Sequence, residues 1–169
     1  FIPGVFKDKG IPFALSSRNS TTESLWFQAA MCVAYGFTRA EALAAITATP
    51  ASMLGLEGEV GCLCPGAAGN VLLISGDPLS VTSFVEYVVL DGNLPVATFA
   101  AARALAAEHG VPVVVDPVSV PKAARLADEV RDLLTVTPSH GELEALGGVA
   151  ALLARGVALV WERRGASGS

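Results

Sequence analysis

The stretch "EYVVLDGNLPVA" at Glu86–Ala97 decides how the fold is read, because its strand fits two different patterns. It can be the last strand of the Gly- and Pro-punctuated segment that precedes it. It can equally be the first strand of a regular alternation of strands and helices that follows it. The sequence on its two sides follows different rules.

Downstream of this stretch, short β-branched runs alternate with Ala-rich helical segments. Strands are expected at "VVL", "VPVVV", "LLTVT" and "VALVW", and helices at "VATFAAARALAAEHG", "VPKAARLADEVRDL", "HGELEAL" and "VAALLARG". Gly110 ends the first helix as its C′ residue, and Leu126, Val130 and Leu133 recur at helical spacing in the second. Such alternation predicts a parallel sheet with right-handed crossovers. The predicted fold class is therefore α/β, with a parallel βαβ sheet over about residues 88–169.

Upstream, a helical region precedes a small β-rich segment. "IPFAL", residues 11–15, is an apolar run typical of a buried strand. A helix at Leu25–Tyr35 is apolar nearly all round and is expected to be buried, with Gly36 at its end. "EGEVGCLCPGAAGNVLLISGDPLS" has strand-length runs separated by turn signals, which predicts short strands.

Two capping boxes mark helix starts in this upstream half. Ser20 with Glu23, and Thr38 with Glu41, have the S/T-x-x-E spacing in which two side chains satisfy free amides at a helix start. Pro50 is expected to interrupt or close the second of these helices.

Composition and charge argue against two classes of function. The 169 residues are 52% hydrophobic and 16% charged, with a net charge of −5. A nucleic-acid surface is not expected, because phosphate binding draws on clustered Lys and Arg. Membrane insertion is not expected either, since no run approaches the ~18 apolar residues of a membrane helix. The chain begins at Phe1 in mid-pattern without a signal peptide, so we expect a cytoplasmic protein and a piece of something longer.

Cys32, Cys62 and Cys64 predict no disulfide framework. The C-x-C within "VGCLCPG" can hold a metal or can place two small side chains on one face of a strand. We favour the second interpretation.

Polar side chains follow each strand of the downstream half. Ligands bind outside the carboxyl ends of the strands in an open parallel sheet, so we expect these side chains to meet at one rim suited to a polar or phosphorylated ligand. Ordinary loop chemistry is the alternative for each of them. They are Asp91 and Asn93; Asp116, Ser119 and Lys122; Thr137, Ser139 and Glu142; and Glu162, Arg163 and Arg164.

The segments "VVLDGNLP", "GVPVVVDPVSVPKAARL", "LLTVTPSHGELEAL" and "GVALVWERRGASGS" resemble, in order, the central part of ribokinase-like (PfkB-type) sugar and nucleoside kinases. The pairing D-x-N-L-P with D-P-V-S-x-x-K is most similar to the pseudouridine kinase branch. The resemblance covers about Val88–Ser169. It implies phosphoryl transfer from ATP to a sugar hydroxyl, with Mg²⁺ neutralising the phosphates.

The same resemblance implies roles for four residues. Glu142 matches the acidic member of the N-x-x-E motif that organises Mg²⁺ and phosphate, and Asp116 and Lys122 lie near the nucleotide. Asn93 lies near the substrate. Ser139 departs from the motif, which has Asn there, and the sequence stops before the G-A-G-D segment that carries the base and the anion hole. We therefore assign no catalytic residue and expect no turnover.

The upstream half, about residues 10–92, resembles the C-terminal end of metal-dependent amidohydrolases of the imidazolonepropionase-like group. That family has a (β/α)₈ barrel and a small β-sandwich, and it uses metal-bound water to hydrolyse amide-like bonds. Here "SSRN" follows "IPFAL" where the metal-binding Asp belongs, and Arg18 would repel a cation. The two histidines, His109 and His140, lie outside this half, so no metal site and no zinc are expected.

The sequence thus predicts two fused fragments, an amidohydrolase-like one at residues 1–90 and a kinase-like one at residues 88–169. The predicted function is that of a truncated, inactive sugar or nucleoside kinase that keeps Mg-ATP and small-molecule binding. A metal-dependent hydrolase fragment and a non-catalytic scaffold are the alternatives. The sequence also allows the chain to form an oligomer.

Overall fold

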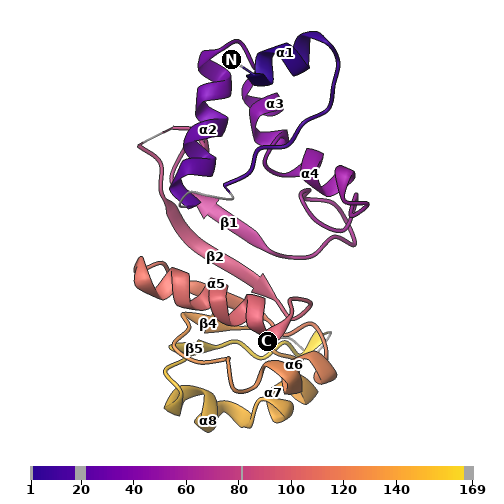
Figure 1. Cartoon of the computed structure of the whole chain (residues 1–169). Helices are drawn as coiled ribbons and strands as arrows, with labels where there is room; N and C mark the ends of the chain where they lie inside the picture. Colours follow the sequence, from indigo (N-terminus) through magenta and orange to yellow (C-terminus); the bar gives the residue numbers. More distant parts are fainter. Residues whose placement is uncertain (1, 18–21, 81, 166–169) are drawn as a thin grey trace. The chain divides into compact units, whose positions relative to one another are not determined.

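The computed structural model describes residues 2–17, 22–80 and 82–165, with side chains described from Leu25 onward in the second of these ranges. The chain forms two compact units (Figure 1). The first comprises Phe1–Ala68 and Ser75–Phe84, and the second comprises Gly69–Ile74 and Val85–Ser169. Among the described residues, no helix is long and apolar enough to cross a bilayer. The predicted division into fragments near residue 90 stays a prediction.

The first unit contains four helices in its described part. They are α1 (Ile2–Asp8), α2 (Thr22–Ala34), α3 (Arg39–Ala44) and α4 (Ala48–Met53). Five buried residues form its core cluster: Ala29, Cys32, Phe37, Ala42 and Leu79. Helix α1 was not expected from the sequence.

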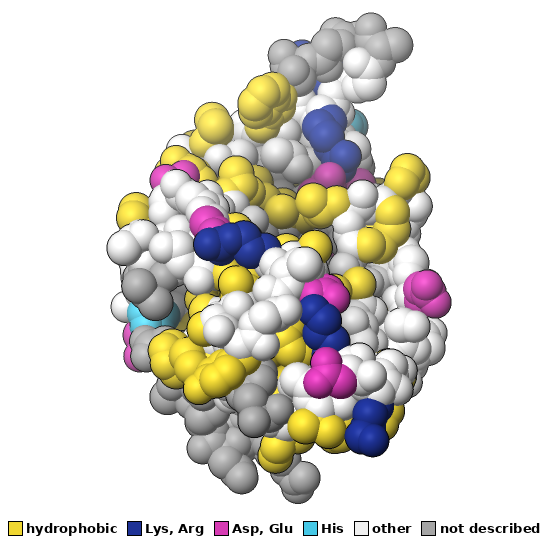
Figure 2. Space-filling model, turned by 90° about the horizontal axis from the view of Figure 1, so that it is seen from above, with side chains coloured by type: hydrophobic (Ala, Val, Ile, Leu, Met, Phe, Trp, Pro, Cys, Tyr) yellow, Lys and Arg dark blue, Asp and Glu magenta, His cyan; other side chains and the backbone are white. Residues whose placement is uncertain are grey.

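Helix α2 confirms the predicted helix but not its complete burial. Ala29 and Cys32 are buried, whereas Phe27 and Tyr35 are each 57% exposed. Hydrophobic side chains are spread over the face of the molecule seen in Figure 2, among charged ones. Gly36 follows the helix with a φ of +94°, a left-handed conformation that glycine adopts without steric cost.

The expected strand at residues 11–15 is wrong, because these residues form no regular element. The amide of Leu15 donates to the carbonyl of Ala45 at 3.0 Å, at the end of a helix, and Phe13 packs edge-on against Phe37. Pro12 offers no amide donor. The apolar run is therefore held by helices and side-chain packing in place of a sheet partner.

The predicted capping box at Thr38 and Glu41 is confirmed. The Thr38 amide donates to Glu41 Oε2 at 2.7 Å, and the Glu41 amide donates to Thr38 Oγ1 at 3.2 Å. The helix is interrupted between α3 and α4, just ahead of Pro50, whose ring is incompatible with a continuous helix through the preceding turn. The Ser20–Glu23 box and Arg18 fall outside the described residues and side chains.

The β-rich segment is mostly irregular. Of the strands expected there, the structure contains β1 (Val71–Ile74) and an isolated bridge between Glu57 and Val60. Cys62 and Cys64 lie in no strand and are joined by a disulfide, so the favoured strand interpretation of the C-x-C is wrong. Gly61 and Gly66, which flank this segment, have φ of +76° and +90°.

The second unit is built on a five-stranded sheet in the order β1-β2-β3-β4-β5. Besides β1, its strands are β2 (Val85–Asp91), β3 (Val113–Asp116), β4 (Thr135–Val136) and β5 (Leu159–Val160). The last four pair in parallel, which confirms the predicted α/β class. Strand β2 also pairs antiparallel with β1. Strand β2 therefore fits both patterns at once, because it lies between β1 and β3 in one sheet.

The connecting segments of this unit form α5 (Val96–Glu108), α6 (Val120–Leu126), α7 (His140–Ala145) and α8 (Gly148–Ala154). The expected C′ role of Gly110 is confirmed by its φ of +66°. Helix α6 ends at Leu126, short of the prediction. Val130 and Leu133 are still buried outside the helix. Between them, Asp132 adopts a φ of +53°, shortly before β4 begins.

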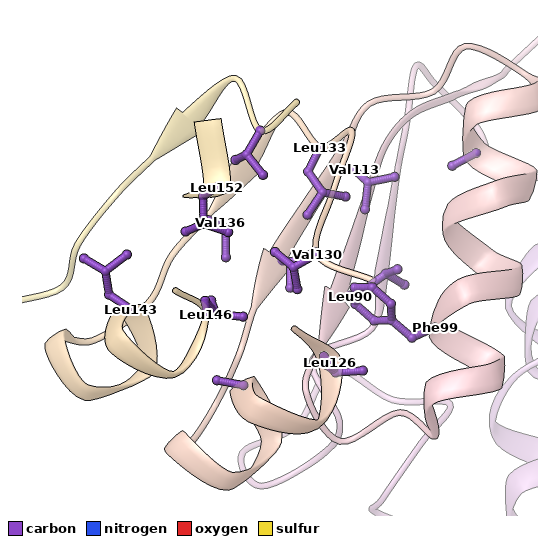
Figure 3. Close-up of a cluster of buried hydrophobic side chains, with 14 residues drawn as sticks. Leu90, Phe99, Val113, Leu126, Val130, Leu133, Val136, Leu143, Leu146 and Leu152 are labelled. Atoms are coloured by element: carbon purple, nitrogen blue, oxygen red, sulfur yellow. The ribbon is translucent and has the colours of Figure 1, made fainter. Parts of the chain in front are cut away.

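The core of the second unit is one cluster of 14 buried residues from both sheet and helices (Figure 3). Leu90, Val115 and Val136 are register partners across three strands and are all buried. Phe99 from α5 and Leu126 from α6 point into the same cluster in Figure 3. Burial of each such side chain contributes about 1.5–3 kcal/mol, and this core fixes the strand ends that carry the polar residues.

Candidate functional site

The carboxyl end of β2 carries a tightly bonded turn around Asp91, which is 5% exposed. Its Oδ2 accepts from the Gly69 amide at 2.6 Å and from Asn93 Nδ2 at 2.9 Å, and its Oδ1 accepts from the Asn93 amide at 2.8 Å. Neutral donors thus satisfy both carboxylate oxygens. Asp91 shapes the turn and presents Asn93, and its carboxylate is already engaged.

Asn93 and Lys122, predicted from two separate motifs, lie next to each other. Lys122 Nζ, at the start of α6, donates to Asn93 Oδ1. One turn further along the same helix, Arg125 Nη2 donates to the carbonyls of Gly92 at 2.7 Å and Leu94 at 3.0 Å. Arg125 was not predicted, although its i+3 spacing from Lys122 places both cations on one helix face.

Gly92 allows the ends of β2 and β3 to approach closely. A Cβ at this position would lie 2.2 Å from the carbonyl oxygen of Pro117 and 3.2 Å from Lys122 Cβ. The Gly92 amide donates to the carbonyl of Asp116 at 2.8 Å, and Asp91 and Asp116 are register partners. The two strand ends are therefore fixed side by side.

A second polar cluster joins the ends of β3, β4 and β5. Arg163 Nη2 lies 3.0 Å from Asp116 Oδ1 and 3.0 Å from Glu142 Oε2. Glu142 is 5% exposed, whereas Asp116 and Arg163 are partly open to solvent. One guanidinium nitrogen thus holds together the two carboxylates that the sequence assigned to the nucleotide rim.

Backbone contacts explain why these three side chains meet. Ser139 and Glu142 form the predicted capping box of α7, and Glu142 Oε2 accepts from the Ser139 amide at 2.8 Å. A bridge pairs Ser139 with Arg163, whose amide donates to the carbonyl of Pro138 at 2.7 Å. The cap therefore aims Glu142 at the end of β5.

The turn after β3 holds Val118 at a φ of +69°, which is rare for a β-branched residue. Its amide donates to Asp116 Oδ1 at 2.9 Å, and this bond accompanies the left-handed turn. Strain of this kind is retained where surrounding contacts over-determine the backbone. The turn orients Asp116 toward Arg163.

A third group lies beyond β5. His140 Nδ1 is 2.9 Å from Glu162 Oε1, and Arg164 Nη2 donates to Glu162 Oε2 at 3.0 Å. The His140 hydrogen bond, followed by that of Arg164, lowers the pKa of Glu162 below its ordinary value of 4.5. His140 was not predicted at the rim. Thr137 Oγ1 donates to the carbonyl of Val115 at 3.3 Å, which is ordinary loop chemistry.

The rim offers oxygen ligands but no closed metal cage. Within the described ranges, no group of three or more His, Cys, Asp and Glu side chains is placed to hold a metal ion. Mg²⁺ in phosphate-transfer sites is bound by one or two protein carboxylates together with substrate phosphates and waters. Asp116 and Glu142 are two neighbouring carboxylates, and in this structure both are ion-paired with Arg163.

Comparisons with known proteins identify no family. No family model matches the chain, and no curated protein matches it. Among solved structures, a carbohydrate kinase from Agrobacterium tumefaciens is similar at 25% identity with a TM-score of 0.42. The match covers 47% of this chain and 28% of that kinase.

Proposed function

We propose that the second unit binds the magnesium complex of a nucleoside triphosphate at its rim, as part of a ribokinase-like sugar or nucleoside kinase. One observation carries the proposal: Asp116 at the end of β3 and Glu142 in the first turn of α7 are both 3.0 Å from Arg163 Nη2. Two carboxylates and a cation at the carboxyl ends of parallel strands are suited to a phosphorylated ligand.

Each side chain has a distinct task in this proposal. Asp116 and Glu142 face the cation that accompanies the phosphates, and Arg163 turns from the carboxylates to the phosphate oxygens. A guanidinium matches phosphate geometry with paired N–H donors. Bound Mg²⁺ neutralises phosphate charge. Lys122 supplies a point charge at the adjacent strand end.

The proposed acceptor is the hydroxyl of a sugar or nucleoside, in the manner of pseudouridine kinases. Asn93 supports this, because its amide is held in place by Asp91 and Lys122 and can bond a hydroxyl group. No residue of the rim is assigned the proton transfer, so the proposal for these residues concerns binding.

Thermal unfolding with and without Mg-ATP tests the proposal. A ligand at 100 times its Kd raises the free energy of unfolding by about 2.7 kcal/mol. Glu142→Gln keeps the hydrogen bonds of the helix cap but removes the charge, so we expect it to lose the magnesium-dependent part of the protection. Lys122→Ala should weaken protection by ATP with or without magnesium.

Lys9→Ala in the first unit is the control and should behave as the original chain. The proposal fails if Mg-ATP gives no protection, or if Glu142→Gln is protected as fully as the original. Pseudouridine and ribose, added with Mg-ATP, test the acceptor separately.

We also propose that the chain arose by fusion of an amidohydrolase-like fragment to a kinase-like fragment. The proposed junction at Val88–Asp91 falls inside β2. The coding DNA on both sides is the test: an intact kinase frame upstream of Val88 would contradict a fusion at this point.

A further inference from the structure

The loop between α4 and β1 contains a feature that the proposed function does not use. Cys62 and Cys64 are joined by a disulfide across a single intervening residue. That residue, Leu63, is 88% exposed, and both cysteines are partly exposed. The bond therefore lies at an accessible turn.

The chain on both sides of this turn is anchored by contacts that do not involve sulfur. Gly61 has a φ of +76°, and a Cβ there would lie 2.6 Å from the carbonyl oxygen of Thr47. The Ala68 amide donates to the carbonyl of Glu59 at 2.7 Å, and the Ala67 amide donates to that of Cys64 at 3.1 Å. These backbone contacts do not depend on the disulfide, so opening the bond removes none of them.

We propose that Cys62 and Cys64 form a reversible redox site that exchanges with small-molecule thiols of the glutathione class. A thiolate attacks one sulfur of the pair, and the other sulfur leaves as a thiolate and takes up a proton. A second small thiol attacks the mixed disulfide and releases the first cysteine. Two small thiols are oxidised to one disulfide, and the protein gains two electrons and two protons.

Short separation and anchoring both favour the intramolecular bond over mixed disulfides. Closing a ring over one intervening residue costs little chain entropy, because the cost grows with loop length. Segment 54–70 carries Glu57 and Glu59 but no Lys, Arg or His, and reactive thiols are typically found near positive charge. We therefore expect exchange over minutes to hours, as in uncatalysed disulfide rearrangement.

Cys32 is an internal reference for this site. It is a free thiol that is fully buried in α2, and burial raises its pKa above 9.0. It should therefore remain unmodified in the folded protein under the conditions that open the Cys62–Cys64 bond.

The experiment is a titration of the full chain in glutathione buffers of graded redox ratio, followed by alkylation and peptide mass spectrometry. Cys62 and Cys64 should gain alkyl groups together, from none to both, at one midpoint, and the reverse titration should follow the same curve. Cys32 should stay unlabelled until the protein is denatured.

Cys62→Ser and Cys32→Ser complete the design. In Cys62→Ser the remaining Cys64 should be alkylated or carry a glutathione adduct at every ratio, whereas Cys32→Ser should keep the original midpoint. The proposal is overturned if both cysteines are alkylated at all ratios, if glutathione adducts or dimers replace the internal bond, or if the bond does not open under reducing conditions.

Discussion

The two units differ most in what their secondary structure buries. In the described part of the chain, the second unit has a cluster of 14 buried residues, and the first has a cluster of five. Both units leave large apolar side chains exposed, such as Phe27 and Leu54 in the first and Leu153 and Trp161 in the second. Strand–helix alternation returns distant segments to one sheet, so their apolar residues converge. The apolar residues of short helices that pack without a sheet converge less.

This difference predicts unequal resistance to unfolding. Units with few buried apolar contacts open at lower free energy than well-packed ones. We therefore expect the first unit to lose its amide protection before the second.

Truncating Phe99 should have the largest effect. Phe99 is fully buried in α5, and Phe→Ala changes in cores cost about 3–5 kcal/mol because they leave a cavity. Urea denaturation, monitored by hydrogen exchange in each unit separately, should show the loss in the second unit. Phe37→Ala in the first unit should cost less, because its neighbours Phe13 and Lys7 are partly exposed and can close over the gap. Equal losses of unfolding free energy in the two variants would contradict the expected difference between the units.

Gly92→Ala should come next, because it tests whether tight packing extends to the rim. The added Cβ would meet the Pro117 carbonyl oxygen at 2.2 Å, and overpacking costs about 1–3 kcal/mol. Gly69→Ala is the matched control in the same unit, since its Cβ would meet Asp91 at an ordinary 3.5 Å. Denaturation midpoints measure both. A Gly92→Ala variant as stable as Gly69→Ala would contradict the close approach of the strand ends.

Removal of a helix cap should cost about 1 kcal/mol in either unit. Thr38→Ala removes the hydroxyl group that accepts from the Glu41 amide, and Ser139→Ala removes its counterpart in the second unit. The melting temperature of the first unit should fall further than that of the second, because a unit with a smaller core has a smaller entropy of unfolding, so the same loss of free energy gives a larger shift. Thr38→Ser keeps the oxygen and should restore most of the loss. Equal shifts would mean that the two units unfold with similar entropy and would contradict the expected difference.

Protonation of Glu41 on acidification should give the smallest effect, and this part of the acid response belongs to the first unit. The Lys7 hydrogen bond, with the Thr38 amide, lowers the pKa of Glu41 from 4.5 to about 2. A lowered folded-state pKa means that the stabilisation is present above pH 4.5 and is lost as the pH falls toward 2. NMR titration should find this pKa raised in Lys7→Gln and unchanged in Lys9→Gln. An unchanged pKa of Glu41 in Lys7→Gln would show that the Lys7 hydrogen bond does not lower it.

The parts of the fold that local chemistry determines could be predicted. The β-branched run of β3, Gly110 after α5 and the capping boxes at Thr38 and Ser139 follow from steric and hydrogen-bonding preferences of a few neighbouring residues. Residues 11–15 could not be predicted correctly, because an apolar run becomes a strand only when a neighbouring strand pairs with it.

The candidate site likewise has a part that the sequence predicts and a part that it does not. Asp116 and Glu142 were expected at the rim because both follow parallel strands, and the structure brings them together. The sequence does not show that one nitrogen of Arg163 contacts both carboxylates, because tertiary contacts decide where a long, flexible side chain ends. The disulfide at Cys62 was missed for a related reason: it depends on the path of an irregular loop.

Strand β2 has a final consequence for how this architecture can be enlarged. Its backbone is engaged on both sides, by β1 in the opposite direction and by β3 in the same direction. An additional strand, whether from this polypeptide or from another molecule, can extend the sheet only at its edges. One margin is β1, which runs against its neighbour, and the other is β5, which runs with it.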